Sequence, residues 1–375
     1  MISPNFAPIF RVETLLYFRY PIRIRLRQNF VLHSQRPNIY TGGIIMNKRE
    51  RVYAALHNQE TDYVPGCFWR HYTIPMKKGQ DIVEAHMEFY RETDVDFIKI
   101  SSDGYFGWPE PTVKNVQHAE ELYKMGHITL DHPFISDQIE RVRRILKEVN
   151  GECYTFYTLF CPLSIFRLQV GWDKMMQCMK EDPKAVMYAC DIIADDVNAM
   201  IGAMIQEGLD GIFYSVQNAE LTRFSLEEYE AWVKPGDLKM LNYMNSVSDT
   251  NILHCCGWDA DEAGTVNHME SWRGYHACTV NWASSVDKID VNGIKEFFPG
   301  SAAWGGFDNR KPALINTGTE EEVKAETHRL IRTYGRKGFL LGPDCSLPDD
   351  IDLKRIRWVM EATKSFDYSI FDKIE

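Results

Sequence analysis

The sequence has no excess of positive charge, no long apolar run and no regular cysteine framework. It contains 42 lysine and arginine residues against 53 aspartate and glutamate residues, which gives a formal net charge of -11. Nucleic-acid phosphates need a basic surface, so this balance argues against a nucleic-acid partner. No stretch approaches the roughly 20 consecutive apolar residues of a membrane helix, so we expect no membrane span. The nine cysteines are an odd number scattered through apolar surroundings. They predict free thiols in a reducing, cytoplasmic setting rather than a disulfide scaffold.

The first 45 residues differ in composition from the rest of the chain. They carry six arginines against a single acidic residue, Glu13, and show no sustained helical period. An arginine-rich, acid-poor leader is typical of a transit peptide, and a start codon assigned upstream of Met46 is the alternative. We favour the second interpretation. Either interpretation predicts a poorly structured extension over residues 1–45 and one folded domain over residues 46–375.

A glycine-rich turn after the first apolar segment is also missing, because that segment ends at Trp69, Arg70 and His71. Its absence argues against a dinucleotide-binding, doubly wound sheet. Eight short apolar segments alternate with helical patterns, which predicts a parallel sheet closed into an α/β (β/α)8 TIM barrel. The expected strands are residues 63–69, 96–101, 154–159, 212–215, 252–253, 277–282, 302–306 and 338–342.

The carboxyl ends of these strands supply the candidate site residues, because barrel enzymes form their active sites there. The catalytic candidates are Asp103, Tyr157 and Asp308. The substrate-binding candidates are Arg70, His71, Ser215, Gln217, Asn281 and Trp282. Strand ends border polar loops in any barrel, so this set alone is weak evidence for chemistry.

A His-x-Cys pair at the end of the fifth expected strand carries more information. Side chains two residues apart on a strand point to the same side, so His254 and Cys256 converge while Cys255 faces away. Cys345, at the end of the last strand, opens onto the same mouth. An imidazole and two thiolates are zinc-type ligands, and catalytic zinc takes three protein ligands and one open position. The alternative is a buried histidine beside cysteines that only fill the core.

Residues 47–366 resemble the uroporphyrinogen decarboxylase superfamily, a family of barrels. The resemblance rests on residues 47–52 through Val64-Pro65, on residues 97–99 leading to Asp103, on residues 305–308 and on residues 342–345. Within it, the His254, Cys256 and Cys345 pattern resembles the zinc motif of the corrinoid-dependent methyltransferases. That branch moves a methyl group between a methylcobamide on a partner corrinoid protein and a small-molecule acceptor, such as the thiol of coenzyme M. The resemblance therefore implies Zn²⁺, a corrinoid partner protein and, more weakly, a homodimer.

The resemblance also suggests roles for three aspartates. In the decarboxylase branch, the aspartate that matches Asp103 contacts the pyrrole NH groups of the substrate. Asp308 and Asp344 are candidates for a fourth metal ligand or for the hydrogen-bond acceptor of His254. Capping of a turn is the alternative for each of these aspartates.

The sequence departs from the decarboxylase pattern where polyanion binding would need it. Decarboxylases carry an Arg-Gln-Ala-Gly-Arg motif after the first strand, whereas this chain has Trp69-Arg70-His71-Tyr72. Only Arg310 and Lys311 add positive charge near another strand end, and a porphyrinogen with many carboxylates would need several guanidinium groups. Porphyrinogen decarboxylation is thus the second hypothesis. A barrel that binds a corrinoid or tetrapyrrole without turnover, with zinc in a structural role, is the third.

Overall fold

The computed structural model describes residues 45–73, 75 and 77–372. The extension predicted over residues 1–45 lies outside these residues, apart from Ile45. Within the described residues, no helix has the length and apolar character needed to cross a membrane. All nine cysteines lie in the described ranges, and all are free thiols. The expectation of a chain without disulfides is therefore confirmed.

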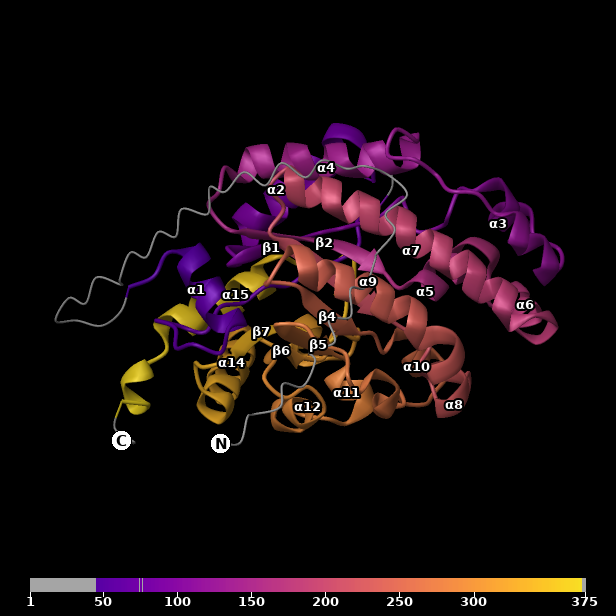
Figure 1. Ribbon diagram of the computed structural model, residues 1–375. Coiled ribbons are helices and arrows are strands. Elements are labelled where there is room, and N and C mark those ends of the chain that lie inside the picture. The colour runs from indigo at the N-terminus through magenta and orange to yellow at the C-terminus, as the bar shows by residue number, and fades with distance from the viewer. Residues whose placement is uncertain (1–44, 74, 76, 373–375) are drawn as a thin grey trace, which may run out of the picture. The chain divides into compact units, whose positions relative to one another are not determined.

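Seven parallel strands form one sheet among the described residues, in the order in which they occur along the chain. Their bounds are β1 Phe97–Ile100, β2 Tyr154–Phe160, β3 Gly211–Val216, β4 Ile252–Cys255, β5 Thr279–Trp282, β6 Ala302–Phe307 and β7 Phe339–Pro343. Each strand pairs only with its sequence neighbours, so the sheet curls with helices on its outer face (Figure 1). The predicted α/β barrel is confirmed.

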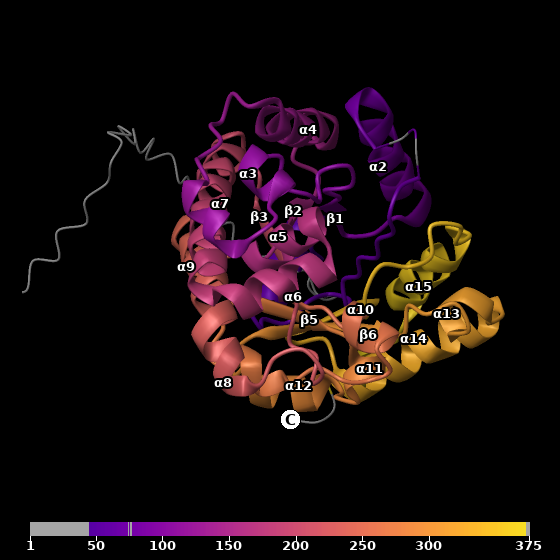
Figure 2. The same cartoon turned by 90° about the vertical axis from the view of Figure 1, so that its right-hand side faces the viewer.

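The helices follow the strands as the alternating pattern predicts, and Figure 2 shows them from the side. They are α1 Lys48–Leu56, α2 Gly79–Thr93, α3 Pro111–Asn115, α4 Pro133–Val149, α5 Pro162–Val170, α6 Trp172–Glu181, α7 Pro183–Gln206, α8 Leu226–Glu228, α9 Lys234–Val247, α10 Trp258–Glu262, α11 Ser284–Asp287, α12 Val291–Phe297, α13 Leu314–Thr317, α14 Glu320–Tyr334 and α15 Lys354–Ser365. Short 3-10 turns cover Ala119–Lys124, Met269–Trp272 and Tyr368–Ile370, and a π-helical turn covers Tyr229–Val233.

The first expected strand, residues 63–69, does not form a regular strand, which corrects the count of eight. It runs extended between β7 and the residue before β1, with isolated parallel bridges at Gly66 and Arg70. The backbone N–H of Cys67 donates to Leu341 O over 3.0 Å, and the Gly66 carbonyl accepts from Asp96 N over 2.9 Å. Pro65 has no N–H, and the Gly66 N–H donates to the Asp96 carboxylate instead of a neighbouring backbone. The segment closes the barrel without a continuous ladder.

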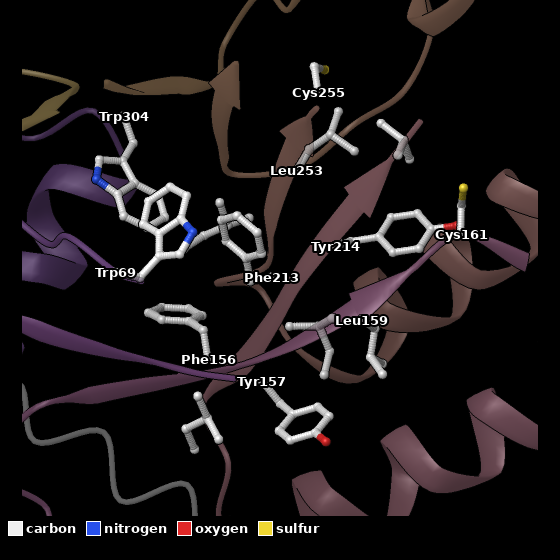
Figure 3. Packing of buried hydrophobic residues seen from close by; sticks show 14 of the residues in the cluster. Trp69, Phe156, Tyr157, Leu159, Cys161, Phe213, Tyr214, Leu253, Cys255 and Trp304 are labelled. Atoms are coloured by element: carbon white, nitrogen blue, oxygen red, sulfur yellow. The ribbon is translucent and has the colours of Figure 1, made fainter. Parts of the chain in front are cut away.

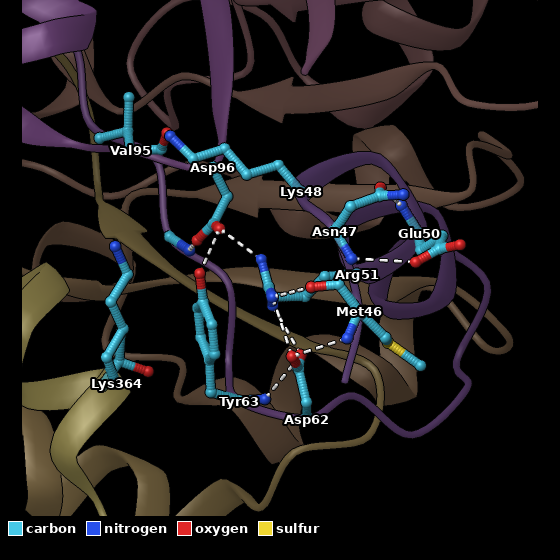
Figure 4. Close-up of polar contacts among 12 residues, drawn as sticks. Met46, Asn47, Lys48, Glu50, Arg51, Asp62, Tyr63, Val95, Asp96 and Lys364 are labelled. Atoms are coloured by element: carbon cyan, nitrogen blue, oxygen red, sulfur yellow. Dashed lines mark hydrogen bonds and ion pairs between the residues drawn. The ribbon is translucent and has the colours of Figure 1, made fainter. Parts of the chain in front are cut away.

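A polar network fixes this closing segment at the N-terminal end of the barrel (Figure 4). The buried Asp96 carboxylate accepts from Arg51 Nη1 over 3.1 Å, from the Tyr63 hydroxyl over 2.9 Å and from Gly66 N over 2.9 Å. Arg51 also pairs with Asp62, over 2.6 Å from Nε. These contacts join α1, the closing segment and the start of β1.

Aromatic side chains fill the interior of the barrel below its carboxyl-terminal mouth. Figure 3 shows Trp69, Phe156, Phe213 and Trp304 together on one side of the strands, with Tyr214 and Leu253 on the other. Trp304 contacts Trp69 at 4.8 Å and Phe213 at 5.7 Å between ring centroids. These contacts fill the interior of the barrel with side chains, as is usual for this fold.

A second buried network surrounds Asp237 on α9 and predicts a pH effect on stability. Asp237 accepts from the hydroxyls of Tyr275 and Tyr229 over 2.9 and 3.1 Å. Burial raises the pKa of Asp237 to about 7, although these two hydrogen bonds oppose the rise. An unfolded aspartate has a pKa of about 3.9, so the unfolded chain holds fewer protons than the folded chain between pH 4 and 7. The contribution of this group to stability is thus complete below about pH 4 and falls as the pH rises towards 7.

Asp237→Asn stays neutral at every pH and should remove this loss. We expect the free energy of unfolding of the variant, relative to the natural chain, to rise by up to about 1.4 kcal/mol per pH unit between pH 4 and 7. Urea unfolding at pH 5, 6 and 7 measures the difference. A difference that does not change with pH would show that Asp237 is ionised in the folded chain throughout this range.

Candidate metal centre

The three predicted metal ligands converge at the mouth of the barrel. His254 lies in β4, Cys256 follows that strand, and Cys345 follows β7. One ligand atom from each side chain lies within 4.8 Å of the other two. His254 Nε2 is 3.7 Å from Cys345 Sγ. The period of two along β4 turns His254 and Cys256 inward, as the sequence predicts, and the parallel order brings β7 round to meet them.

Asn281 on β5 orients the imidazole of His254. The Asn281 amide nitrogen donates to Trp304 O over 2.8 Å and to Pro343 O over 2.9 Å, so its oxygen must face His254 Nδ1, which lies 2.5 Å away. An acceptor at Nδ1 fixes the tautomer in which Nδ1 carries the proton. Nε2 is therefore free to bind a metal on the side of Cys345.

The two thiols are electrostatically linked. Cys256 Sγ accepts a hydrogen bond from Gln217 Nε2 over 3.5 Å, and the side-chain oxygen of Gln217 accepts one from Arg167 over 2.7 Å. The hydrogen bond between the thiols raises the pKa of Cys256 and lowers the pKa of Cys345. Of the two thiols, Cys345 is therefore the one that loses its proton more readily.

A cavity of about 690 Å³ opens above the three ligands. Five tryptophan and phenylalanine rings contribute to its wall, those of Trp69, Phe106, Phe160, Phe213 and Trp258. Phe213 stacks on His254 with 5.0 Å between ring centroids. A concave, largely apolar chamber with a few polar groups at one end is the usual form of a small-molecule site.

A hydrogen-bonded chain of three side chains lies in the same cavity. Asp103 Oδ1 is 2.7 Å from His71 Nδ1, and His71 Nε2 is 3.1 Å from the hydroxyl of Ser346. Burial alone would raise the pKa of Asp103, but His71 and the Tyr72 N–H lower it to about 2. The carboxylate is therefore ionised at neutral pH, and it holds the proton of His71 on Nδ1.

Lys99 is a cavity residue that the strand-end positions did not identify. Its ammonium lies 4.6 Å from the ring centroid of Phe213 and 5.2 Å from that of Trp69. Burial lowers the pKa of Lys99 to about 8, although Asp103 and the cysteines oppose this change. The available signal was a single lysine inside the apolar β1 sequence Phe97–Ile100, at an inward position.

The other predicted site residues divide between the cavity and its surroundings. Ser215 and Gln217 line the cavity with His71 and Asp103. Arg70 is not among the lining residues, and it donates to the carbonyl of Asp349, which is, over 2.7 Å. Asp308 is not among the lining residues, and it pairs with Arg310, which is.

Three candidates at strand ends face away from the cavity or serve another residue. Tyr157 is buried and donates to Gln138 on α4 over 2.8 Å. Trp282 donates to Ile289 O over 2.8 Å, behind the sheet. Asn281 holds His254 instead of reaching the cavity. Side chains alternate along a strand, so Asn281 points inward and its neighbour Trp282 outward.

Asp344 and Asp308 were also expected near the metal, and neither contacts His254 in the described structure. Asp344 is buried and accepts from the Ser284 hydroxyl and Ser285 N, both over 2.7 Å. Burial raises the pKa of Asp344 to about 6 against these two hydrogen bonds. The acceptor of His254 Nδ1 is Asn281, which corrects the expectation of an aspartate.

Asn281→Ala should weaken metal binding without removing a ligand. We expect about 10- to 100-fold lower zinc affinity, because His254 loses the acceptor that fixes its tautomer and orientation. Asn281→Asp is the matched control, since it keeps an oxygen for His254 but loses the two donations to carbonyl groups. Competition with a chelator measures affinity, and thermal unfolding measures stability. Equal affinity losses in both variants would show that Asn281 acts only through the fold.

Comparison with known proteins places these features in context. The family described as Uroporphyrinogen decarboxylase (URO-D) matches residues 93–366. A relative from Methanosarcina acetivorans named Methylcobamide:CoM methyltransferase is 21% identical over 348 residues, which cover 85% of this chain and 98% of the relative. The protein of the same name from Methanosarcina mazei is 20% identical over the same length and the same shares of the two chains.

Two solved structures share the fold. A methyltransferase from Methanosarcina mazei aligns with a TM-score of 0.63 at 13% identity, over 85% of this chain and 99% of its own. A B12-independent methionine synthase from Shewanella aligns with a TM-score of 0.51 at 9% identity, over 83% of this chain and 98% of its own.

Proposed function

The chain belongs to the uroporphyrinogen decarboxylase family, and within that family we propose that it is a zinc-dependent methyltransferase. It would move a methyl group between a corrinoid carried by a partner protein and a thiol or similar small acceptor. The observation that carries this proposal is the convergence of His254, Cys256 and Cys345 within 4.8 Å at the base of an open cavity. The names of the two Methanosarcina relatives support it. The proposal includes a cytoplasmic location, and a homodimer remains a prediction.

The donor set fits zinc. Two sulfurs and one imidazole nitrogen are ligands that zinc prefers, and three protein ligands leave one position for an exchangeable group. When bound, zinc would lower the pKa of an acceptor thiol, so that the acceptor keeps its nucleophilic anionic form near neutral pH.

The chain itself supplies a group to receive the proton of that thiol. His71 Nε2 faces the cavity beside Ser346, and Asp103 keeps the other ring nitrogen protonated. In the proposed reaction, His71 Nε2 takes the proton as the acceptor enters, and Asp103 stabilises the imidazolium that forms.

The charged side chains around the cavity count against porphyrinogen decarboxylation. Arg167 is paired with Asp259 over 2.9 Å, and Arg310 is paired with Asp308 over 2.6 Å. Arg70 is not among the residues that line the cavity, and its guanidinium donates to the backbone carbonyl of Asp349. A substrate with many carboxylates would need unpaired guanidinium groups in the cavity, and these three are engaged elsewhere.

The test uses zinc-loaded protein, free methylcobalamin in place of the protein-bound cofactor, and a set of small thiols. We expect the methylcobalamin absorbance to fall only when both zinc and a thiol are present, and chelator to stop the reaction. Decarboxylation of uroporphyrinogen in the presence of chelator would support the second hypothesis instead. A melting temperature that depends on zinc, with no methyl transfer to any acceptor, would support the third hypothesis, a barrel that binds a corrinoid or tetrapyrrole without turnover.

A further inference from the structure

Lys99 places a positive charge without an acidic partner in the same cavity as the metal ligands. It lies at an inward position of β1, and its side chain opens into the cavity that the three ligands also line. Phe213 connects the two, because the Lys99 ammonium lies 4.6 Å from its ring centroid and the His254 ring 5.0 Å from it. Within the described ranges, the Lys99 ammonium forms no hydrogen bond and no ion pair. A cation with no partner in a partly desolvated cavity needs an anion that the chain does not supply.

Asp103 is the negative side chain that acts most strongly on the charge of Lys99. Both of its carboxylate oxygens, however, already accept hydrogen bonds from other residues. Oδ1 is bonded to His71 and Oδ2 accepts from Tyr72 N over 2.8 Å. The other cations that line the cavity are either paired with acids, as Arg167 and Arg310 are, or exposed at its rim, as Lys311 is. Lys99 is thus the cation that faces the inner end of the cavity.

A count of charges shows what this position would favour, if zinc is bound as proposed above. One divalent ion and two thiolates sum to zero, and Lys99 and Asp103 also sum to zero. An acceptor that gives its proton to His71 adds one negative charge beside the ligands and one positive charge beside Asp103. The imidazolium then pairs with Asp103, and Lys99 is left to balance the acceptor anion.

We propose that Lys99 is a specificity-determining residue, whose ammonium selects an acceptor that binds beside His254, Cys256 and Cys345 as an anion. The inference rests on the proposed function and adds to it the residue that favours the anionic form of the acceptor. A neutral acceptor that binds through a lone pair gains nothing from Lys99. If Lys99 served instead only as a counter-ion for the two cysteine thiolates, its loss would weaken the binding of the metal itself.

The experiment compares the natural chain with Lys99→Met, which keeps the length of the side chain without its charge, and with Lys99→Arg, which keeps the charge. Zinc content is measured first. The cobalt(II)-loaded proteins are then titrated with 2-mercaptoethanol as a thiolate ligand and with imidazole as a neutral ligand, and the visible spectrum reports binding. We expect Lys99→Met to bind zinc at least as tightly as the natural chain, because a nearby positive charge repels the ion. Its affinity for the thiolate should fall about tenfold or more, while its affinity for imidazole stays within about twofold. Lys99→Arg should recover most of the thiolate affinity.

The possible outcomes separate the two proposals. Zinc in both chains with equal thiolate affinity overturns the role of Lys99 and leaves the methyltransferase proposal standing. Equal losses for both ligands, or loss of zinc from Lys99→Met, show a structural role and also overturn it. A natural chain that takes up no zinc overturns the methyltransferase proposal and the inference with it.

Discussion

Cys256→Ala is expected to lose its zinc and, with it, methyl transfer from methylcobalamin. Cys256 supplies one of three converging ligand atoms, and removal of a ligand should cost more than the roughly 10- to 100-fold that removal of a ligand's supporting contact costs. We therefore expect at least about 100-fold weaker zinc affinity and a parallel loss of activity. His254→Ala and Cys345→Ala should behave in the same way. Zinc content after dialysis and methylcobalamin consumption are the measurements.

The neighbouring cysteine provides a matched control. Cys255 is fully buried, and its side chain points to the opposite side of β4 from His254 and Cys256. Cys255→Ala should keep about one zinc per chain and nearly full activity, with at most a modest loss of stability from the smaller side chain. If Cys255→Ala and Cys256→Ala lost zinc equally, the metal would not be held by the inward-facing set.

Asp96→Ala is expected to produce a large loss of stability. The carboxylate is fully buried and accepts hydrogen bonds from Arg51, Tyr63 and Gly66, which together hold the closing segment against β1. Removal of one partner of a buried ion pair leaves the other charge without its counter-ion and typically costs about 3–5 kcal/mol. Denaturant unfolding measures this loss in the free energy of unfolding.

Asp94→Asn is the control for that measurement. Asp94 pairs with Lys48 and Lys364 at the surface, where it is 33% exposed, and asparagine tolerates the left-handed backbone at this position. A surface ion pair is worth about 1 kcal/mol or less, so the control should remain close to the natural chain. Similar losses in the two variants would show that burial of the Arg51–Asp96 pair is not what closes the barrel.

The fold was largely predictable because apolar periodicity is a local signal. Seven of the eight expected strands are present, and their alternation with helices was enough to identify a parallel barrel. The segment over residues 63–69 was mistaken for a regular strand because its composition is strand-like. Its hydrogen bonding depends on Asp96, about 30 residues later, whose carboxylate takes the Gly66 N–H from the ladder.

The site was predictable where strand parity decides the outcome. The spacing of two brought His254 and Cys256 to one side, and the topology brought Cys345 to meet them. The position of a residue at a strand end does not by itself show which way the side chain points. Tyr157 and Trp282 were therefore predicted as site residues together with the residues that do line the cavity, although both face away from it.

Contacts between distant strands could not be predicted. The bond between Asn281 and His254 depends on the register of β4 against β5, and the contact between His71 and Ser346 joins residues 275 positions apart. Lys99 was overlooked because its role comes from two rings, Trp69 and Phe213, that belong to other segments. These contacts set charge and orientation, which sequence spacing does not encode.

X-ray absorption at the zinc edge of the purified protein tests the central proposal most directly. It should show two sulfur neighbours at about 2.3 Å and one imidazole nitrogen at about 2.0–2.1 Å, with a fourth light atom. Addition of a small thiol should replace that light atom with a third sulfur. A chain without zinc, or a zinc with no sulfur neighbour from the protein, would contradict the assignment of His254, Cys256 and Cys345 as its ligands.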